Sequence, residues 1–256
     1  QQRQRRAPQA CHKNVLAADG TTDLVDNNTF SVLLNSENKD FSENTNAVFT
    51  VNPGNYAAAE AAEPNYTFVS NSGAVSVGSN DTADIYIVNK QNPGSILGYK
   101  FNADGQTGLS GWTINLLSCS VGHLNCSQTT STTTGLNGFY EFLGLNSGFY
   151  QVAEVMQTGW TNISPVSLNV DLSAPGATSS ANNFTNFEKI SVTACKKVDT
   201  DGSLDTSNDQ TPKFDWTVNL LTDDQVSDTQ STSENGCYTW TDLGPNHTYG
   251  VSEVVP

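Results

Sequence analysis

The sequence is poor in charge, and basic residues are especially few. Charged side chains make up 14% of its 256 residues, and 11 basic against 26 acidic residues give a net charge of −15. A chain with so little Lys and Arg can neutralise few phosphates, which argues against nucleic acid as a partner. No apolar run approaches the ~20 residues of a membrane span. The three His (His12, His123 and His247) include no i,i+4 pair, so no histidine-based metal or general-base signature is present.

Arginine is absent after the sixth residue. Arg3, Arg5 and Arg6 are the only three, and the remaining polarity comes mostly from 28 Asn, 26 Ser and 29 Thr. Charge runs of this kind are usually solvated. We therefore interpret residues 1–9 as a basic tail or linker.

Cysteine is sparse, and no Cys-x-x-Cys pair occurs, which disfavours zinc. Cys119 and Cys126 flank six residues, a spacing that a hairpin closes easily, and Cys195 and Cys237 begin two strand-like runs. Paired in this way they form two disulfides and leave Cys11 as a thiol or for an intermolecular bond. Five buried thiols in a cytosolic protein are the alternative.

Seven Asn-x-Ser/Thr sequons agree with a secreted, glycosylated surface protein, although a chain so rich in these residues contains several by chance. They are Asn27, Asn65, Asn80, Asn125, Asn162, Asn183 and Asn246.

Strand signals dominate the chain. Runs of four to eight residues rich in Val, Ile, Thr and aromatic residues alternate with Gly, Asn, Pro and Asp, and no window of 12 residues keeps a helical period. This pattern predicts an all-β fold.

Three landmarks recur in the same order along the chain: a Lys followed closely by Asp-Gly, an aromatic residue that leads an apolar strand, and Tyr-x-x-x-Glu. The Lys residues are Lys13, Lys100 and Lys197; the aromatic residues are Phe30, Trp112 and Trp216; the Tyr and Glu residues are Tyr56 with Glu60, Tyr150 with Glu154, and Tyr249 with Glu253. The spacing predicts three units near residues 10–95, 96–192 and 193–256.

A fourth landmark, an Asn that ends a strand, is found in the first two units only. Asn89 and Asn186 each precede the next unit's Lys by 11 residues. The third unit stops three residues after Glu253, so we expect it to lack its last strands. Either the chain is an excerpt of a longer tandem protein, or a neighbouring subunit donates the missing strands.

These landmarks resemble the Cna-B or prealbumin-like domains of surface adhesins and pilins, and the related B domains of serine-aspartate repeat adhesins. The clearest stretches are Gly-Tyr-Lys-Phe-Asn-Ala-Asp-Gly from residue 98 and Gly-Phe-Tyr-Glu-Phe-Leu-Gly-Leu from residue 138. The resemblance implies three tandem antiparallel β-sandwiches of the prealbumin-like or Ig-like kind, the third incomplete.

In many domains of that family a first-strand Lys is joined covalently to a last-strand Asn, with the Glu of the Tyr-x-x-x-Glu box assisting. The Lys must be neutral to attack the Asn carbonyl, which burial favours, and the Glu can move the proton. Carried onto matching positions, the resemblance implies isopeptide trios of Lys13, Glu60 and Asn89, and of Lys100, Glu154 and Asn186, with Lys197 and Glu253 lacking an Asn. The alternative is a purely structural Lys and a hydrogen-bonded structural Glu.

One loop also resembles the calcium loops of the serine-aspartate B domains. It holds Asp199, Asp201, Asp205 and Asp209 around Gly202, and Ca²⁺ prefers such clustered oxygen ligands. A plain Asp-Gly turn is the other interpretation.

The function expected from these features is structural: a subunit or segment of an extracellular fibre, pilus or cell-surface stalk, with copies of itself end to end as partners. An adhesin module that binds a host protein or glycan through its loops is the alternative. An enzyme is disfavoured, because the carboxylates lie in turns or in a repeated box, and repetition indicates a scaffold.

Overall fold

The computed structural model describes residues 7–199 and 210–255, and these residues form strands and no helix. The prediction of an all-β chain is confirmed. By its internal contacts the chain divides into two compact units, one of Gln1–Tyr99, Ser110–Glu154 and Ser167–Asn183, the other of Lys100–Leu109, Val155–Val166 and Phe184–Pro256. The boundaries predicted near residues 95 and 192 stay predictions. Residues 7–9, predicted as part of a tail or linker, instead belong to the first strand and pair with residues 49–51. In the described residues no helix is long and apolar enough to cross a membrane.

Ten strands form the N-terminal part of the chain. They are β1 (Ala7–Leu16), β2 (Asp23–Leu24), β3 (Phe30–Leu34), β4 (Glu37–Phe41), β5 (Ala47–Val51), β6 (Gly54–Tyr56), β7 (Ala59–Glu60), β8 (Tyr66–Asn71), β9 (Val75–Val77) and β10 (Ala83–Gln91). Alternate residues of β1, β3, β5 and β10 are buried, as a sheet with one face on a core requires.

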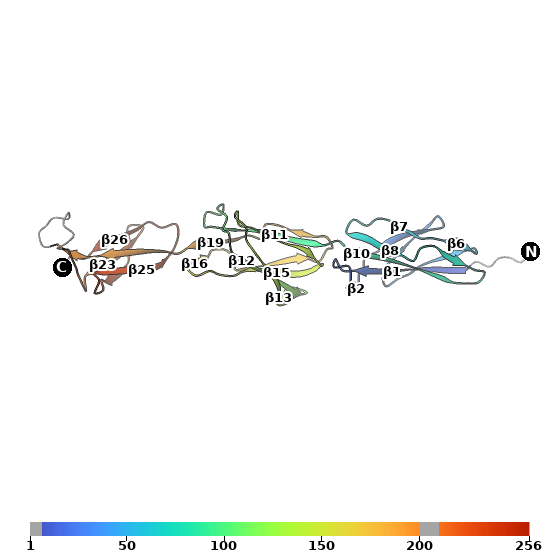
Figure 1. The fold of residues 1–256 in the computed structure, drawn as a ribbon, viewed down its shortest axis with the longest axis horizontal. Helices are drawn as coiled ribbons and strands as arrows, with labels where there is room; N and C mark the ends of the chain where they lie inside the picture. Colours follow the sequence, from blue (N-terminus) through green and yellow to red (C-terminus); the bar gives the residue numbers. More distant parts are fainter. Residues whose placement is uncertain (1–6, 200–209, 256) are drawn as a thin grey trace, which may run out of the picture. The chain divides into compact units, whose positions relative to one another are not determined.

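Strand β1 lies at the centre of the first sheet. It pairs antiparallel with β2 and β5 and parallel with β10, beside which it lies in Figure 1, and β10 pairs in turn with β8. A second sheet has the order β4-β3-β7, and β6 pairs with β9. Between them lies a core that includes Phe30, Phe49, Ile85 and Ile87.

Nine further strands follow. They are β11 (Gly94–Phe101), β12 (Thr113–Ser120), β13 (Leu124–Thr133), β14 (Phe139–Leu145), β15 (Gly148–Glu154), β16 (Trp160–Asn162), β17 (Ser167–Leu172), β18 (Thr178–Ser179) and β19 (Phe184–Glu188). One sheet has the order β13-β12-β15-β17. Strand β11 pairs antiparallel with β14 and parallel with β18 and, through Lys100 and Phe101, with β19.

Gly98, two residues before Lys100, has a steric role. A Cβ atom there would lie 2.1 Å from the carbonyl oxygen of Asn182, which also accepts a hydrogen bond of 2.5 Å from the Tyr140 hydroxyl. Only glycine permits this close approach of two backbone segments.

The last strands are β20 (Ile190–Cys195), β21 (Lys197–Val198), β22 (Thr211–Pro212), β23 (Thr217–Thr222), β24 (Gln225–Ser231), β25 (Cys237–Leu243) and β26 (Tyr249–Glu253). They pair antiparallel as β20-β25, β21-β22 and β24-β23-β26. The core here is small and includes Ala194, Val218, Leu220 and Trp240.

Two turns show the internal repetition in atomic detail. Gly138 and Gly236 both have a positive φ, +78° and +77°, and each donates its amide to a carbonyl three residues back at 2.8 Å. In each turn the next residue donates its amide to the side chain of an Asn, Asn137 or Asn235. The positive φ explains why glycine stands at this point of both copies.

Candidate functional site

Strands β1 and β10 bring Lys13 and Asn89 onto one face of the same sheet. In the parallel ladder Lys13 pairs with Ile87, and Asn89 lies two residues further along β10. Because residues two apart share a face, Lys13 and Asn89 are diagonal neighbours on the core side. Both are buried, with exposed fractions of 7% and 3%.

Glu60 reaches Lys13 from the opposite sheet. It lies on β7, opposite Val32 of β3, and its Oε1 accepts a hydrogen bond from the Lys13 ammonium nitrogen, with both side chains almost fully buried. The Lys13 nitrogen also lies 3.9 Å from the ring centre of Phe30. Burial lowers the pKa of Lys13, and the hydrogen bond to Glu60 opposes this only in part. A lowered pKa favours the neutral amine, which is the nucleophilic form.

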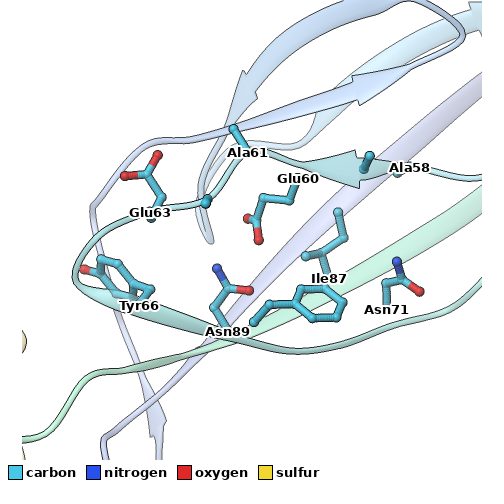
Figure 2. A pocket seen from close by; sticks show the side chains of 11 residues that line it. Ala58, Glu60, Ala61, Glu63, Tyr66, Asn71, Ile87 and Asn89 are labelled. Atoms are coloured by element: carbon cyan, nitrogen blue, oxygen red, sulfur yellow. The ribbon is translucent and has the colours of Figure 1, made fainter.

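Asn89 is the third residue of the predicted trio. Its Oδ1 is buried and has no hydrogen-bond partner among the residues that the structure describes. It lines a cavity of about 410 Å³ together with Glu60, Glu63, Tyr66 and Ile87, and Figure 2 shows the side chains of Glu60 and Asn89 pointing toward one another. The predicted trio is therefore brought together.

The second predicted trio repeats the same register. Lys100 of β11 pairs in parallel with Phe184 of β19, so Asn186 again lies two residues beyond the partner of the Lys. Glu154 pairs with Ile114, just as Glu60 pairs with Val32. Lys100, Glu154 and Asn186 are all buried.

The third predicted pair requires a correction. The residue in contact with Glu253 is Lys196, at 2.5 Å, and not Lys197, which is exposed and lies in β21, where it pairs with Pro212 of β22. The reason is strand alternation: Ala194 faces the core, so Lys196 faces the same way and Lys197 faces outward. Glu253 itself keeps the repeated register, opposite Val218.

The Tyr of each Tyr-x-x-x-Glu landmark has a shared role that the sequence did not reveal. Tyr56, Tyr150 and Tyr249 each donate their hydroxyl to a backbone carbonyl four or five residues earlier, at 2.8, 2.8 and 3.1 Å. This bond holds the turn that precedes the strand on which the Tyr lies; that strand also carries the Glu in β15 and β26, whereas Glu60 lies on the next strand, β7. The sequence signal that could have indicated this role is the recurrence of Tyr four residues before each Glu.

The cysteines pair as the spacing suggested. Cys119 is bonded to Cys126 across the β12–β13 hairpin, and Cys195 is bonded to Cys237, which lies opposite it in the β20–β25 pair. Cys11 is a free thiol buried in the first core, where an intermolecular bond cannot reach it without unfolding.

We expect Cys11 to resist thiol reagents in the folded protein. It is fully buried, and burial raises its pKa to about 11, so that only about one thiol in a thousand is ionised at pH 8. Labelling with Ellman's reagent at pH 8 should detect no thiol in the native protein and one in guanidinium chloride. Rapid labelling of the native protein would contradict this burial.

The candidate calcium ligands Asp201, Asp205 and Asp209 lie outside the described residues, and Asp199 stands at their edge. Within the described part of the chain, no group of three or more His, Cys, Asp or Glu side chains is placed to hold a metal ion. The Asp-Gly segment at residue 104 forms a plain turn, in which the carboxylate of Asp104 accepts hydrogen bonds from the backbone amides of Gln106 and Thr107.

The sequons differ in accessibility. Five Asn side chains are exposed, those of Asn27, Asn65, Asn80, Asn125 and Asn246. Asn162 and Asn183 are half-buried: Nδ2 of Asn162 donates to the carbonyl oxygen of Ser164, and Oδ1 of Asn183 accepts from the backbone amide of Tyr99. Glycosylation stays a prediction, with the five exposed sites better placed.

No protein-family model matches the chain, and no curated protein matches it. Solved structures do match the chain. The Bacillus anthracis TIE protein aligns with 98% of this chain at a TM-score of 0.58 and 14% identity, and the chain spans 46% of that protein.

Two B repeat units of the collagen binding protein of Staphylococcus aureus align with 98% of the chain and 69% of their own length at 19% identity and a TM-score of 0.35. A streptococcal ancillary pilin aligns over 98% of the chain and 96% of its own at 12% identity and a TM-score of 0.36. The chain therefore shares the fold of the TIE protein, with which its TM-score is above 0.5, and at 14% identity this likeness concerns the fold alone.

Proposed function

We propose that the chain is a load-bearing segment of an extracellular fibre, pilus or cell-surface stalk, built from tandem β-sandwiches near residues 10–95, 96–192 and 193–256. The observation that carries this proposal is the placement of Lys13 and Asn89 on the first and last strands of one sandwich, buried together beside Glu60. Two disulfides fit an oxidising extracellular environment. Copies of the chain, end to end, are the proposed partners.

The site supports a covalent bond between Lys13 and Asn89. The neutral Lys13 nitrogen attacks Cγ of Asn89, and the bond from Cγ to Nδ2 breaks. Glu60 takes a proton from the attacking nitrogen and delivers it to the departing nitrogen, which leaves as ammonia. Amine and amide thus give a new amide and ammonia, with no oxidant or metal required. The side chains react once, so we propose no enzymatic turnover.

Such a bond has a mechanical consequence. Strand β1 begins the sandwich and β10 ends it, and they lie side by side. Tension that enters at one end would pass through the Lys13–Asn89 bond to the other end, and the residues between them would carry none. The equal register of Lys100 and Asn186 supports a second bond of the same kind.

The chemistry is tested by the intact mass of the reduced protein. We expect a deficit of two ammonia molecules, one for each trio. Glu60→Gln, which cannot move the proton, should reduce the deficit to one. A full mass in the wild-type protein would refute the bond while leaving the fold untouched.

The mechanical role is tested by single-molecule pulling. In the wild-type protein residues 14–88 should not extend. Asn89→Ala should release about 250 Å of chain, since 75 residues extend by about 3.4 Å each. Equal extension of the two proteins would contradict a load-bearing role for this pair.

A further inference from the structure

A cluster of polar side chains lies next to the first trio. Gln91 follows Asn89 by two residues on β10, and because residues two apart share a face, it also points into the core. There it meets Asp26: its Nε2 donates to Oδ2 of Asp26 at 3.1 Å, and both side chains are buried.

Asp26 connects three strands through this cluster. Its Oδ2 accepts a second hydrogen bond, at 2.8 Å, from the hydroxyl of Tyr66 on β8. The backbone amide of Asp26 donates to Oε2 of Glu43 at 2.6 Å, and the other oxygen of Glu43 accepts from the backbone amide of Val15 on β1. Strands β1, β8 and β10 are therefore tied together just beyond the trio.

The backbone ladder beside Asn89 is irregular. Between β10 and β8 the pairing shifts by one residue at Val88 and Asn89, which leaves Val69 of β8 without a counterpart. An extra residue of this kind disrupts the ladder locally. The ladder with β8 thus constrains β10 less at Asn89 than elsewhere, and the contacts of Gln91 two residues later supply a second constraint.

The same cluster reaches the Lys side of the site. The ring of Tyr66 packs edge-on against Phe30, with ring centres 5.0 Å apart, and the Lys13 nitrogen lies over the ring of Phe30. A bond that fixes Tyr66 therefore also supports the ring on which Lys13 rests.

We infer that Asp26 is a positioning residue for the first trio. Its bond to Gln91 fixes Asn89 along β10, and its bond to Tyr66 supports the surroundings of Lys13. Asp26 acts through these neighbours and takes no part in the proton transfer. The inference rests on the proposed bond between Lys13 and Asn89.

The charge of Asp26 would act on the reaction in the opposite direction. The carboxylates of Asp26 and Glu43 raise the pKa of Lys13 and so oppose the larger lowering by burial. Loss of the Asp26 charge would lower the pKa of Lys13 further and increase the neutral, nucleophilic fraction. An electrostatic role therefore predicts a faster reaction in Asp26→Asn, whereas a positioning role predicts a slower one.

The test follows bond formation while the full chain refolds. Protein that has stayed unfolded since its synthesis, as recovered from inclusion bodies, has not reacted, and dilution into a redox buffer starts folding. Peptide mapping by mass gives separate rates for the first cross-link, Lys13 to Asn89, and the second, Lys100 to Asn186. Circular dichroism gives the folded fraction, so that rates are compared for folded molecules only.

Asp26→Asn should slow the first cross-link about tenfold in folded protein, the usual effect of losing one hydrogen bond to a charged group. An Asn side chain has one acceptor oxygen in place of two, so it cannot keep every bond that Asp26 accepts. The second cross-link should keep its rate, because the position that matches Gln91 is occupied there by Glu188, which is exposed.

Two further variants sharpen the test. Asp40→Asn is the matched control: it removes the same charge from an exposed side chain of β4 and should leave both rates unchanged. Gln91→Leu breaks the bond to Asp26 from the other side and should also slow the first cross-link about tenfold. Because both changes remove one contact, the double variant should be little slower than either single variant.

The inference is overturned if Asp26→Asn forms the first cross-link at the wild-type rate or faster, or if both cross-links slow equally. If Asp26→Asn does not fold, Gln91→Leu decides in the same way. A wild-type chain that forms neither cross-link refutes the proposed bond, and the inference with it, so the two failures are told apart.

Discussion

Asn89→Ala is expected to lower the free energy of unfolding of the first sandwich by about 4.5 kcal/mol. The proposed Lys13–Asn89 bond would close a loop of 76 residues (89 − 13), and a cross-link of that length restricts the unfolded chain by about this amount in the loop-entropy model. For a unit of this size the melting temperature should fall by about 20 °C. Calorimetry, with hydrogen exchange of β1 and β10 to assign the transition, measures the change.

Asn14→Ala is the matched control for this substitution. Asn14 lies next to Lys13 on β1 but on the opposite face, where its amide bonds to Asp23 at 3.2 Å. It cannot reach the buried site, and its loss should cost about 1 kcal/mol or less. If Asn89→Ala and Asn14→Ala lower the stability equally, Asn89 contributes no more than an ordinary hydrogen bond and the cross-link is absent.

Replacing both Cys195 and Cys237 with Ser is expected to have the second largest effect, a loss of about 4 kcal/mol from the C-terminal strands. This disulfide closes a loop with a sequence separation of 42, whereas Cys119 and Cys126 are separated by 7, for which the same model gives about 2 kcal/mol. Denaturant unfolding of the two double variants compares them directly.

The structure gives a second reason why loss of the Cys195–Cys237 disulfide should cost more stability than loss of the Cys119–Cys126 disulfide. Strand β20 has one neighbouring strand among the described residues, and the core beneath it includes four buried residues, against fourteen in the first core. The Cys195–Cys237 bond therefore joins two strands that have few other contacts to hold them together. Cys119 and Cys126 instead cross-link a hairpin whose strand β12 also pairs with β15. If the two double variants lose the same free energy of unfolding, the number of neighbouring strands and the size of the core do not affect what each disulfide contributes.

The repeated register explains which features were predictable. Phe30, Trp112 and Trp216 each lead a strand in which the residue two positions later pairs with the Glu of the Tyr-x-x-x-Glu landmark. Because alternation and turn residues act locally, they appear in the sequence as landmarks of constant order. The strands and the repeat could therefore be predicted from the residues, whereas the first trio was implied by the resemblance to Cna-B domains.

Two features could not be predicted in the same way. A strand carries adjacent Lys residues on opposite faces, and the choice of Lys196 over Lys197 depended on which face Ala194 turned to the core. The buried environment of Lys13 likewise depends on Phe30 and Glu60, which come from a different sheet.

The sequence by itself determined the all-β class and the repeated order of Lys, aromatic residue, Tyr and Glu, and its spacing favoured the two cysteine pairs. Only the tertiary structure decided which Lys faces each Glu and how deeply the Lys13–Glu60 pair is buried. The physical reason is that strand propensity and alternation are properties of neighbouring residues, whereas burial and ion pairing arise where separate strands meet.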